Sequence, residues 1–263
     1  MEKHSITAAS VNLRVDNEWD GENAFANRRG WVAQQLRALG ADIYGFQEAK
    51  LHMRAFLEDA LPEYAFLGCG RDVDCGGEHT PVAYKKDAFS LLELRNFWLS
   101  LTPDVPGSRY GADQSSCPRI CTVARLLHKA SGRSLLFYNT HLDHVGAVAQ
   151  LLGAAQIRQA LSRDLPAAHA PMTAIITGDF NVTPESDCIR LMTQDLLTGD
   201  VVLQDATAGL SGTYHGFGSV EPSKIDYIFT NAPFAGSRVL GGKSPEGLWF
   251  SDHEMVASEI ELL

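Results

Sequence analysis

Hydrophobic and polar residues along the chain form patterns that predict strands interleaved with helices. Apolar residues three and four positions apart indicate helices, and short apolar runs indicate buried strands. We expect helices at residues 23–39, 52–60 and 146–163, the last with Val148, Leu151, Leu152, Ala155 and Leu161 on its apolar side. We expect strands at residues 6–15, 42–46, 81–85, 89–99, 121–127, 135–140, 173–177, 225–230 and 255–262. Because several neighbouring strands follow each other as hairpins would, the pattern favours an α/β sandwich with mixed sheets over a purely parallel sheet.

Polar side chains recur where the predicted strands end. Asn12, Glu48, His141 and Asp179 each stand at or just past the end of an apolar run. Strand ends are how a rigid scaffold brings distant residues into one site. We therefore expect these four residues to share a functional site.

The segment Gly178-Asp179-Phe180-Asn181 carries the strongest chemical signal. In extended chain, Asp179 and Asn181 point to the same side. A carboxylate there can take a proton from water, and the amide can orient it or donate to a phosphate oxygen. The alternative is that both residues only cap a turn, as Asp and Asn often do.

The segment from Asn139 to His144 adds a candidate donor. Alternation places Asn139, His141 and Asp143 on one face of a strand, where the imidazole can donate to a phosphoryl oxygen. We interpret His144 as a structural histidine.

Near the C-terminus, Asp226 begins an apolar strand, and a buried carboxylate there is costly unless it is paired. We expect it to pair with His253 and to keep that ring protonated toward a phosphate.

Three further residues complete the candidates. Glu48 offers the hard oxygen ligand that Mg²⁺ prefers, although a surface glutamate before a helix is the plainer interpretation. Of the adjacent pair Asp252 and His253, one can reach a metal and the other the phosphate. Arg119 can contact phosphate through its planar fork, or can simply be an exposed arginine on a strand.

Composition narrows the classes of partner. The chain has 263 residues without a linker-like segment, which favours a single domain over residues 1–263. A net charge of −10 gives little support for tight nucleic-acid binding and argues against duplex DNA as substrate, but it suits a small anion held by a metal.

Five cysteines without a CxxC pair indicate reduced thiols. With neither a signal-peptide pattern nor a membrane-spanning stretch, we take a cytoplasmic protein as the default.

Taken in order, the motifs resemble those of the endonuclease/exonuclease/phosphatase superfamily, which includes pancreatic deoxyribonuclease, neutral sphingomyelinases and inositol-polyphosphate phosphatases. The matching motifs are Asn12, Gln47-Glu48, Asn139-Thr140-His141-Leu142, Gly178-Asp179-Phe180-Asn181, Ile225-Asp226-Tyr227 and Ser251-Asp252-His253. Other marks look like an uncharacterised bacterial branch: Asp20-Gly21-Glu22-Asn23, Asn96-Phe97-Trp98-Leu99-Ser100, Pro118-Arg119 and His215-Gly216-Phe217.

The resemblance implies a deoxyribonuclease-like, four-layer sandwich of two mixed β-sheets flanked by helices. It also implies a phosphoesterase that uses Mg²⁺, with Mn²⁺ as the other candidate ion. The implied metal ligands are Glu48, with Asn12 and Asp252 beside it. Some members carry a second carboxylate two residues after the position of Asn12, and this chain has Arg14 there.

The same resemblance assigns catalytic roles. Asp179 would position or deprotonate the attacking water with support from Asn181. His141 and His253 would bind the phosphoryl oxygens, with Asp226 holding His253. Asn139, Asn181 and Arg119 complete the expected phosphate contacts.

Three functions follow in order. The first is a phosphodiesterase acting on a small molecule or on short single-stranded nucleic acid. The second is a phosphomonoesterase acting on a phosphorylated sugar, polyol or nucleotide. The third is a non-catalytic module that binds metal and phosphate.

Overall fold

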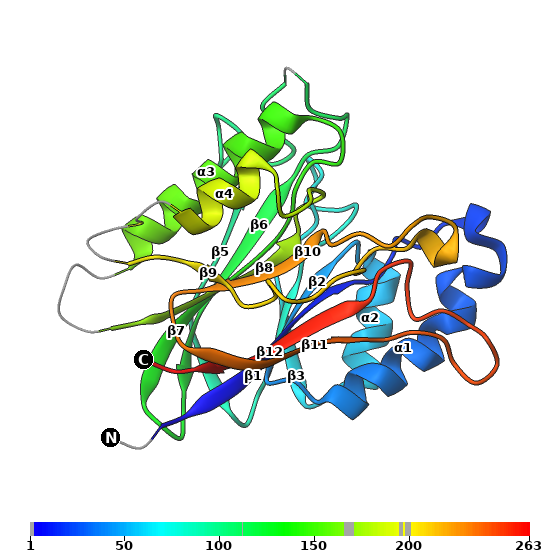
Figure 1. Ribbon diagram of the computed structural model, residues 1–263, viewed down its shortest axis with the longest axis horizontal. Helices are drawn as coiled ribbons and strands as arrows, with labels where there is room; N and C mark the ends of the chain where they lie inside the picture. Colours follow the sequence, from blue (N-terminus) through cyan, green and yellow to red (C-terminus); the bar gives the residue numbers. More distant parts are fainter. Residues whose placement is uncertain (1–2, 112, 166–170, 195–196, 198–200) are drawn as a thin grey trace.

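Two β-sheets pack face to face between two layers of helices (Figure 1). The structure, a computed structural model, describes residues 3–111, 113–165, 171–194, 197 and 201–263. Within this part of the chain, each sheet has six strands. The observed architecture confirms the predicted four-layer sandwich of mixed sheets.

The first sheet is built from both ends of the chain. In spatial order its strands are β11 (Phe234–Leu240), β12 (Met255–Glu261), β1 (Ser5–Asn12), β2 (Ile43–Gln47), β4 (Val82–Lys85) and β3 (Tyr64–Leu67). Only β1 and β2 run parallel, and the other neighbours are antiparallel. The parallel pair lies near the middle of the sheet, where both strands are covered.

The second sheet comes from the central part of the chain. Its strands, in spatial order, are β5 (Phe89–Trp98), β6 (Ile120–His128), β7 (Arg133–His141), β8 (Thr173–Asp179), β10 (Asp226–Thr230) and β9 (Gln204–Asp205). Here too one central pair, β7 and β8, is parallel, and the others are antiparallel. Each sheet therefore has a single parallel pair.

Helices cover the outer face of each sheet. The α-helices are α1 (Phe25–Leu39), α2 (Leu51–Ala60), α3 (Ala147–Asp164) and α4 (Asp187–Gln194), and the short 3-10 helices are η1 (Glu18–Asn23) and η2 (Gly216–Gly218). One apolar cluster joins α1 and α2 to the first sheet, and a second joins α3 and α4 to the second sheet. A third cluster lies between the sheets.

Every element that the hydrophobic pattern predicted is present, with ends shifted by up to three residues. The pattern missed β3, β9, β11 and α4. In β11 a bulge between Ala235 and Arg238 and the positive φ of Gly236 interrupt the strand, so its alternation is lost. The other three are short, which gives a periodicity little room to show.

The predicted apolar side of α3 is correct at Leu161 but wrong for most of the helix. Val148, Leu151 and Leu152 are exposed, and the buried apolar positions are Ala149, Gly153, Ala154, Ile157 and Leu161. A Cβ atom added at Gly153 would lie 3.1 Å from Leu99 and 3.2 Å from Leu142. Because the helix packs so closely at Gly153, small residues face the sheet at this part of the helix and the neighbouring Leu151 and Leu152 point outward.

A network of polar side chains links the two sheets near the C-terminal ends of β2, β7 and β8. Asn139 on β7 donates to the carbonyl of Phe46 on β2 at 2.6 Å, and accepts from the amide of Gln47 at 2.7 Å. Thr177 on β8 also donates to Asn139, at 3.0 Å. Glycine at position 45 leaves room for this network, because a Cβ there would lie 2.1 Å from the Thr177 hydroxyl oxygen.

None of the helices in the described residues combines the length and apolar character needed to cross a bilayer.

Candidate active site

The strand ends of both sheets meet in one cleft. The parallel pair β1 and β2 brings Asn12 and Glu48 to this edge, and the parallel pair β7 and β8 brings His141 and Asp179. The two antiparallel strands β10 and β12 begin here, so their N-terminal ends deliver further residues. The residues that the sequence placed at strand ends thus converge, as predicted.

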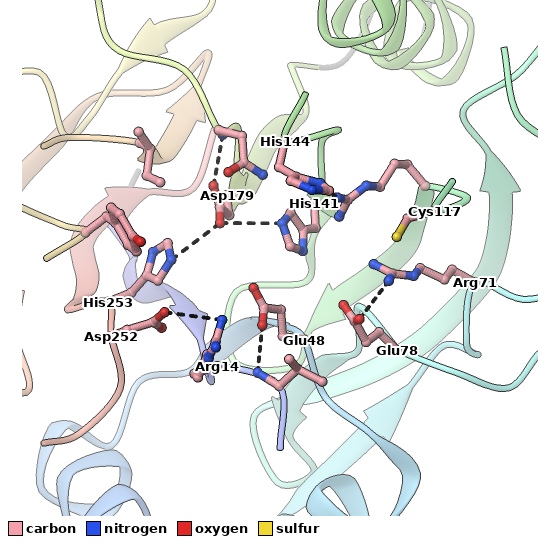
Figure 2. A pocket seen from close by; sticks show the side chains of 15 residues that line it. Arg14, Glu48, Arg71, Glu78, Cys117, His141, His144, Asp179, Asp252 and His253 are labelled. Atoms are coloured by element: carbon pink, nitrogen blue, oxygen red, sulfur yellow. Dashed lines mark hydrogen bonds and ion pairs between the residues drawn. The ribbon is translucent and has the colours of Figure 1, made fainter. Parts of the chain in front are cut away.

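The cleft has a volume of about 390 Å³ (Figure 2). Its lining residues are Arg14, Val15, Glu48, Arg71, Glu78, Cys117, Arg119, His141, His144, Asp179, Asn181, Tyr214, Ile225, Asp252 and His253. Charged and imidazole groups dominate this lining. Such a cleft suits a small, strongly polar ligand better than an apolar one.

Three of the lining residues have strained backbones. Arg14, Glu48 and Asn181 have φ values of 55°, 61° and 54°, in the left-handed region that non-glycine residues seldom adopt. Each of these residues comes one or two positions after the end of a strand. Backbone strain of this kind persists where the surrounding structure fixes it, and it gathers at functional sites.

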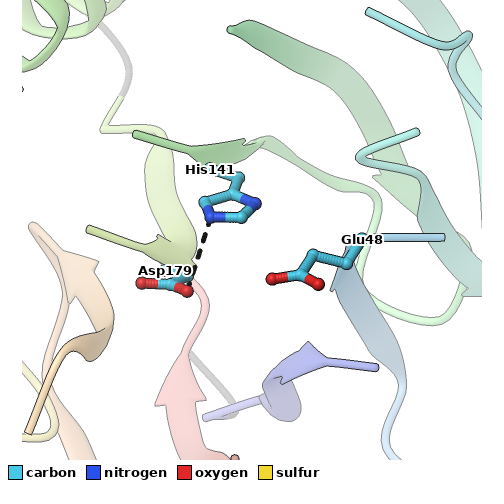
Figure 3. Close-up of side chains that lie close together, drawn as sticks. All are labelled: Glu48, His141 and Asp179. Carbon is cyan, nitrogen blue, oxygen red and sulfur yellow. Dashed lines mark ion pairs between the residues drawn. The ribbon is translucent and has the colours of Figure 1, made fainter. Parts of the chain in front are cut away.

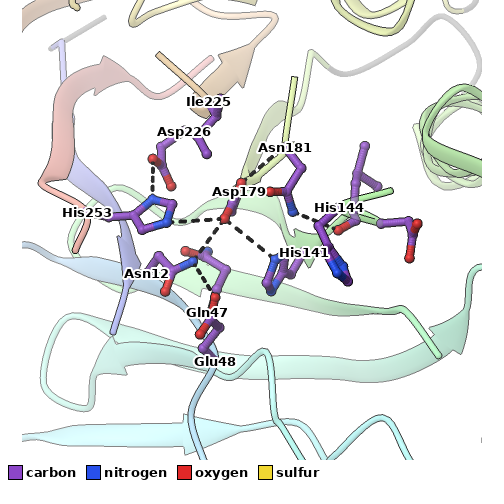
Figure 4. Close-up of polar contacts among 12 residues, drawn as sticks. Asn12, Gln47, Glu48, His141, His144, Asp179, Asn181, Ile225, Asp226 and His253 are labelled. Atoms are coloured by element: carbon purple, nitrogen blue, oxygen red, sulfur yellow. Dashed lines mark hydrogen bonds and ion pairs between the residues drawn. The ribbon is translucent and has the colours of Figure 1, made fainter. Parts of the chain in front are cut away.

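Asp179 lies at the centre of the cleft, where several groups hold its carboxylate (Figure 4). Its Oδ2 atom accepts from the Asn12 side-chain amide at 2.9 Å, and its Oδ1 atom accepts from the Asn181 backbone N–H at 2.9 Å. Burial and the nearby Asp226 raise its pKa to about 7. Asp179 is therefore oriented from two sides and is no simple turn cap.

His253 reaches Asp179 from one side of the cleft. Its Nδ1 atom lies 2.9 Å from Oδ2 of Asp226, and its Nε2 atom lies 3.7 Å from Oδ2 of Asp179. Burial alone would lower the pKa of His253, but Asp226 and Asp179 raise it to about 10. The pairing expected between Asp226 and His253 is present, and it leaves the ring positively charged.

His141 reaches the same carboxylate from the other side. Its Nε2 atom lies 3.5 Å from Oδ2 of Asp179. Burial and the neighbouring Arg119 lower its pKa well below the usual histidine value. Asp179 thus has one charged and one neutral imidazole beside it.

Glu48 faces the cleft opposite His141 and Asp179, and one ligand atom from each of these three residues falls within 4.8 Å of the others (Figure 3). Burial would raise the pKa of Glu48, but hydrogen bonds from the Val15 backbone and the Asn12 amide lower it. Its carboxylate is consequently charged and fixed. Such a group can bind a divalent cation.

Asn12 and Asp252 differ in their access to the space beside Glu48 where a cation could bind. Asn12 donates to Glu48 at 3.0 Å and to Asp179, and its side-chain oxygen accepts from the Arg14 backbone at 2.9 Å. In this arrangement Asn12 positions two carboxylates. Asp252 lines the cleft directly, and an Arg14 guanidinium nitrogen lies 3.7 Å from its carboxylate.

The expected phosphate contacts divide into two groups. Asn181 and Arg119 line the cleft. Asn139 does not: it is fully buried, and its side chain is occupied by the inter-sheet network. The structure therefore corrects the expectation that Asn139 contacts phosphate, because in the sandwich this residue faces the opposite sheet.

Several lining residues were missed by the sequence analysis. Arg71 and Glu78 come from the irregular segment between β3 and β4, where no periodicity marks them. Tyr214 and Cys117 likewise belong to loops. His144, interpreted from sequence as structural, lines the cleft and contacts Arg119 at 2.9 Å.

A family model described as "Endonuclease/Exonuclease/phosphatase family" matches residues 9–253. No curated protein matches the chain.

Solved structures agree with this match. A Bacteroides vulgatus endonuclease/exonuclease/phosphatase is 33% identical with a TM-score of 0.90, over 99% of this chain and 100% of that one. A mannosyl-6-phosphatase from Bacteroides thetaiotaomicron is 31% identical with a TM-score of 0.85, over 98% and 100% of the two chains.

A more distant match is TDP2 of D. rerio, crystallised with a single-strand DNA product. It is 16% identical with a TM-score of 0.72, over 97% of this chain and 98% of that one. At this identity the similarity shows a common fold alone.

Proposed function

The chain belongs to the endonuclease/exonuclease/phosphatase family, and from this premise we propose that it is a divalent-metal-dependent phosphoesterase that releases phosphate from a small phosphomonoester. The convergence of Glu48, His141, Asp179 and His253 on one cleft is the observation that supports this most strongly. Their chemistry supplies a cation ligand, a water-orienting carboxylate and two imidazole donors. Together these components can catalyse metal-assisted phosphoester hydrolysis.

The donor set fits a hard divalent cation. Glu48 carries a charged carboxylate toward the cleft, and Asp252 lines the same space. We propose that these two residues hold Mg²⁺, or Mn²⁺ in its place, with Asn12 keeping Glu48 in position. A bound cation supplies charge neutralisation for the phosphate and for the leaving oxygen.

Asp179 is the residue that presents the attacking water. Its carboxylate is held by Asn12 on one oxygen and by the Asn181 backbone on the other, which leaves it little freedom to rotate. A fixed carboxylate aligns a water and accepts its proton as the bond to phosphorus forms. The raised pKa of Asp179 favours that acceptance.

The two imidazoles bind the phosphoryl group. His253 is charged because of Asp226 and offers Nε2–H, while neutral His141 offers an N–H from the opposite side. Donors fixed in advance stabilise the negative charge that develops on the phosphoryl oxygens. Asp226 does not touch the substrate in this scheme but orients His253.

The choice of a phosphomonoester departs from the sequence-based order, in which a phosphodiester came first. Two observations support the change. The mannosyl-6-phosphatase relative shares 31% identity over 98% of this chain. The cleft, at about 390 Å³, has room for one small molecule.

A substrate panel tests this function. p-Nitrophenyl phosphate and bis-p-nitrophenyl phosphate are supplied with Mg²⁺ or Mn²⁺, and each reaction is repeated with EDTA. We expect the monoester to exceed the diester in kcat/KM by at least about tenfold, and EDTA to abolish both rates. A preference for the diester would restore the phosphodiesterase assignment. With no turnover of either ester, the chain would be a binding module.

A further inference from the structure

Arg119 ends in a buried guanidinium group whose donors are incompletely paired. The residue is 3% exposed and lines the cleft. Its Nη2 atom bonds Nδ1 of His144 at 2.9 Å, but Nε and Nη1 have no hydrogen-bond partner among the described residues. Nε lies 3.6 Å from Asp143, too far for a hydrogen bond. Leaving charged donors unpaired in a buried place is costly, so a ligand that accepts from them is expected.

The groups around Arg119 form a distinct end of the cleft. Arg71, Glu78 and Cys117 lie on the far side of His141 and Glu48 from His253 (Figure 2). Nη2 of Arg71 bonds Oε1 of Glu78 at 2.7 Å. We call Arg71, Glu78, Arg119 and His144 the distal subsite.

The hydrogen bonds around Arg119 define which groups donate and which accept. Arginine can only donate, so Nδ1 of His144 must accept from Arg119, and the proton of this neutral ring is on Nε2. His144 is exposed at the rim, where Nε2–H can donate to a ligand. Asp143 accepts from the backbones of Ser115, Val145 and Gly146 and so is fixed beside Arg119.

Together with the neighbouring Asp143, the charges of the distal subsite balance. Glu78 neutralises Arg71, and Asp143 lies beside Arg119, so no excess positive charge remains to attract a second anion. Glu78 lines the same part of the cleft as Arg119, so its carboxylate offers an acceptor on the same side as the unpaired guanidinium donors. A hydroxyl group uses both kinds of partner at once, since it accepts from one and donates to the other.

We propose that the distal subsite binds the hydroxyl groups of a sugar or polyol leaving group, with Arg119 as the main donor and Glu78 as the acceptor. This inference rests on the proposed phosphomonoesterase function and narrows its substrate class. Arg119 then determines specificity for the leaving group, in place of the direct phosphate contact expected from the sequence.

Two phosphomonoesters with the same kind of leaving oxygen can distinguish binding of the leaving-group hydroxyls from contact with the phosphate. Mannose 6-phosphate and n-hexyl phosphate both release a primary alcohol, but only the first carries further hydroxyls. We expect wild-type kcat/KM to favour mannose 6-phosphate by at least about a hundredfold, because a site built to hydrogen-bond hydroxyls rejects an analogue that lacks them.

The variant Arg119→Lys keeps the charge and removes the planar fork. We expect it to reduce the preference for mannose 6-phosphate by at least about tenfold, with most of the loss in KM. The matched control is Arg190→Lys, which makes the same change on the exposed surface of α4. It should retain the wild-type preference.

A second variant guards against misfolding of the first. Glu78→Gln lies at a partly exposed position and should also lower the preference, because the amide is a poorer acceptor than the carboxylate. Equal losses on both esters in the folded Arg119→Lys variant would make Arg119 a phosphate contact and overturn the inference. So would a wild-type enzyme that hydrolyses the two esters equally. Hydrolysis of p-nitrophenyl phosphate but of neither of these two esters would also overturn the inference, whereas hydrolysis of no phosphomonoester at all would overturn the proposed function itself.

Discussion

His253 and Asp179 show how single residues define the chemistry of the cleft. Asp226 accepts from one nitrogen of His253, which turns the other nitrogen toward Asp179. Asn12 and the Asn181 backbone hold Asp179 from two further directions. Because these partners are themselves buried, the geometry exists before any substrate binds, and preorganisation of this kind lowers the cost of reaching the transition state.

In the proposed mechanism Asp226 positions His253, and the effect of removing its charge can be measured. The substitution Asp226→Asn keeps the size of the side chain but removes its charge, so the pKa of His253 falls and its ring is held less firmly. We expect kcat to fall by about a hundredfold or more, with a smaller change in KM. Steady-state kinetics with p-nitrophenyl phosphate and Mg²⁺ would show this.

The control for this variant is Asp59→Asn, the same substitution at an exposed position on α2. It should retain the wild-type kcat. If Asp226→Asn remains folded and keeps more than about half of the wild-type kcat, the role given to Asp226 is wrong.

At the scale of elements, the two parallel strand pairs explain why the site forms where it does. Parallel neighbours end at the same edge of a sheet, so β1 with β2 and β7 with β8 each bring two polar residues together. Antiparallel β10 and β12 begin at that edge and add Asp226 and His253. The inter-sheet network of Asn139 then fixes one sheet relative to the other just below the cleft.

Gly45 on β2 is the point at which this network can be disturbed. In Gly45→Ala the new Cβ would lie 2.1 Å from the Thr177 hydroxyl oxygen and 2.6 Å from the Asn139 side-chain oxygen. We expect the free energy of unfolding to fall by about 2–4 kcal/mol, since overpacking adds to the loss of buried hydrogen bonds. Urea unfolding measures this difference.

A matched alanine substitution lies on α1. A Cβ at Gly30 meets nothing within 4 Å, so Gly30→Ala should stabilise the protein by about 0.5–1 kcal/mol through helix propensity. Equal stabilities of Gly45→Ala and the wild type would show that the sheets can move apart at no cost, contrary to the packing described here.

The elements also show where sequence patterns are informative. A buried strand that runs into Asp179 is visible because its apolar run is uninterrupted. The buried face of α3 was assigned wrongly because small residues, including Gly153, face the sheet where the helix packs closely. Periodicity reports where large apolar residues recur, and it carries no information on how near the next layer lies.

At the scale of the whole molecule, the site depends on both sheets. The motifs carried by Glu48 and Asp179 could be identified from the sequence, and their resemblance to a known superfamily implied that they meet. Arg71 and Glu78 could not be predicted, because they come from an irregular segment whose path is set by the assembled sandwich. Asn139 was misassigned for a related reason, since only the position of the opposite sheet shows where its side chain points.

We propose that the strand ends of the two sheets form the active centre of a metal-dependent phosphoesterase. The most direct test is phosphate release from p-nitrophenyl phosphate with Mg²⁺, measured for the wild type, for Asp179→Asn and for the Asp59→Asn control. Asp179→Asn removes the carboxylate that we propose presents the water, and it leaves Glu48 in place. We expect its kcat to fall by at least about a thousandfold while the control keeps the wild-type rate. A folded Asp179→Asn variant that releases phosphate as fast as the wild type would contradict the account.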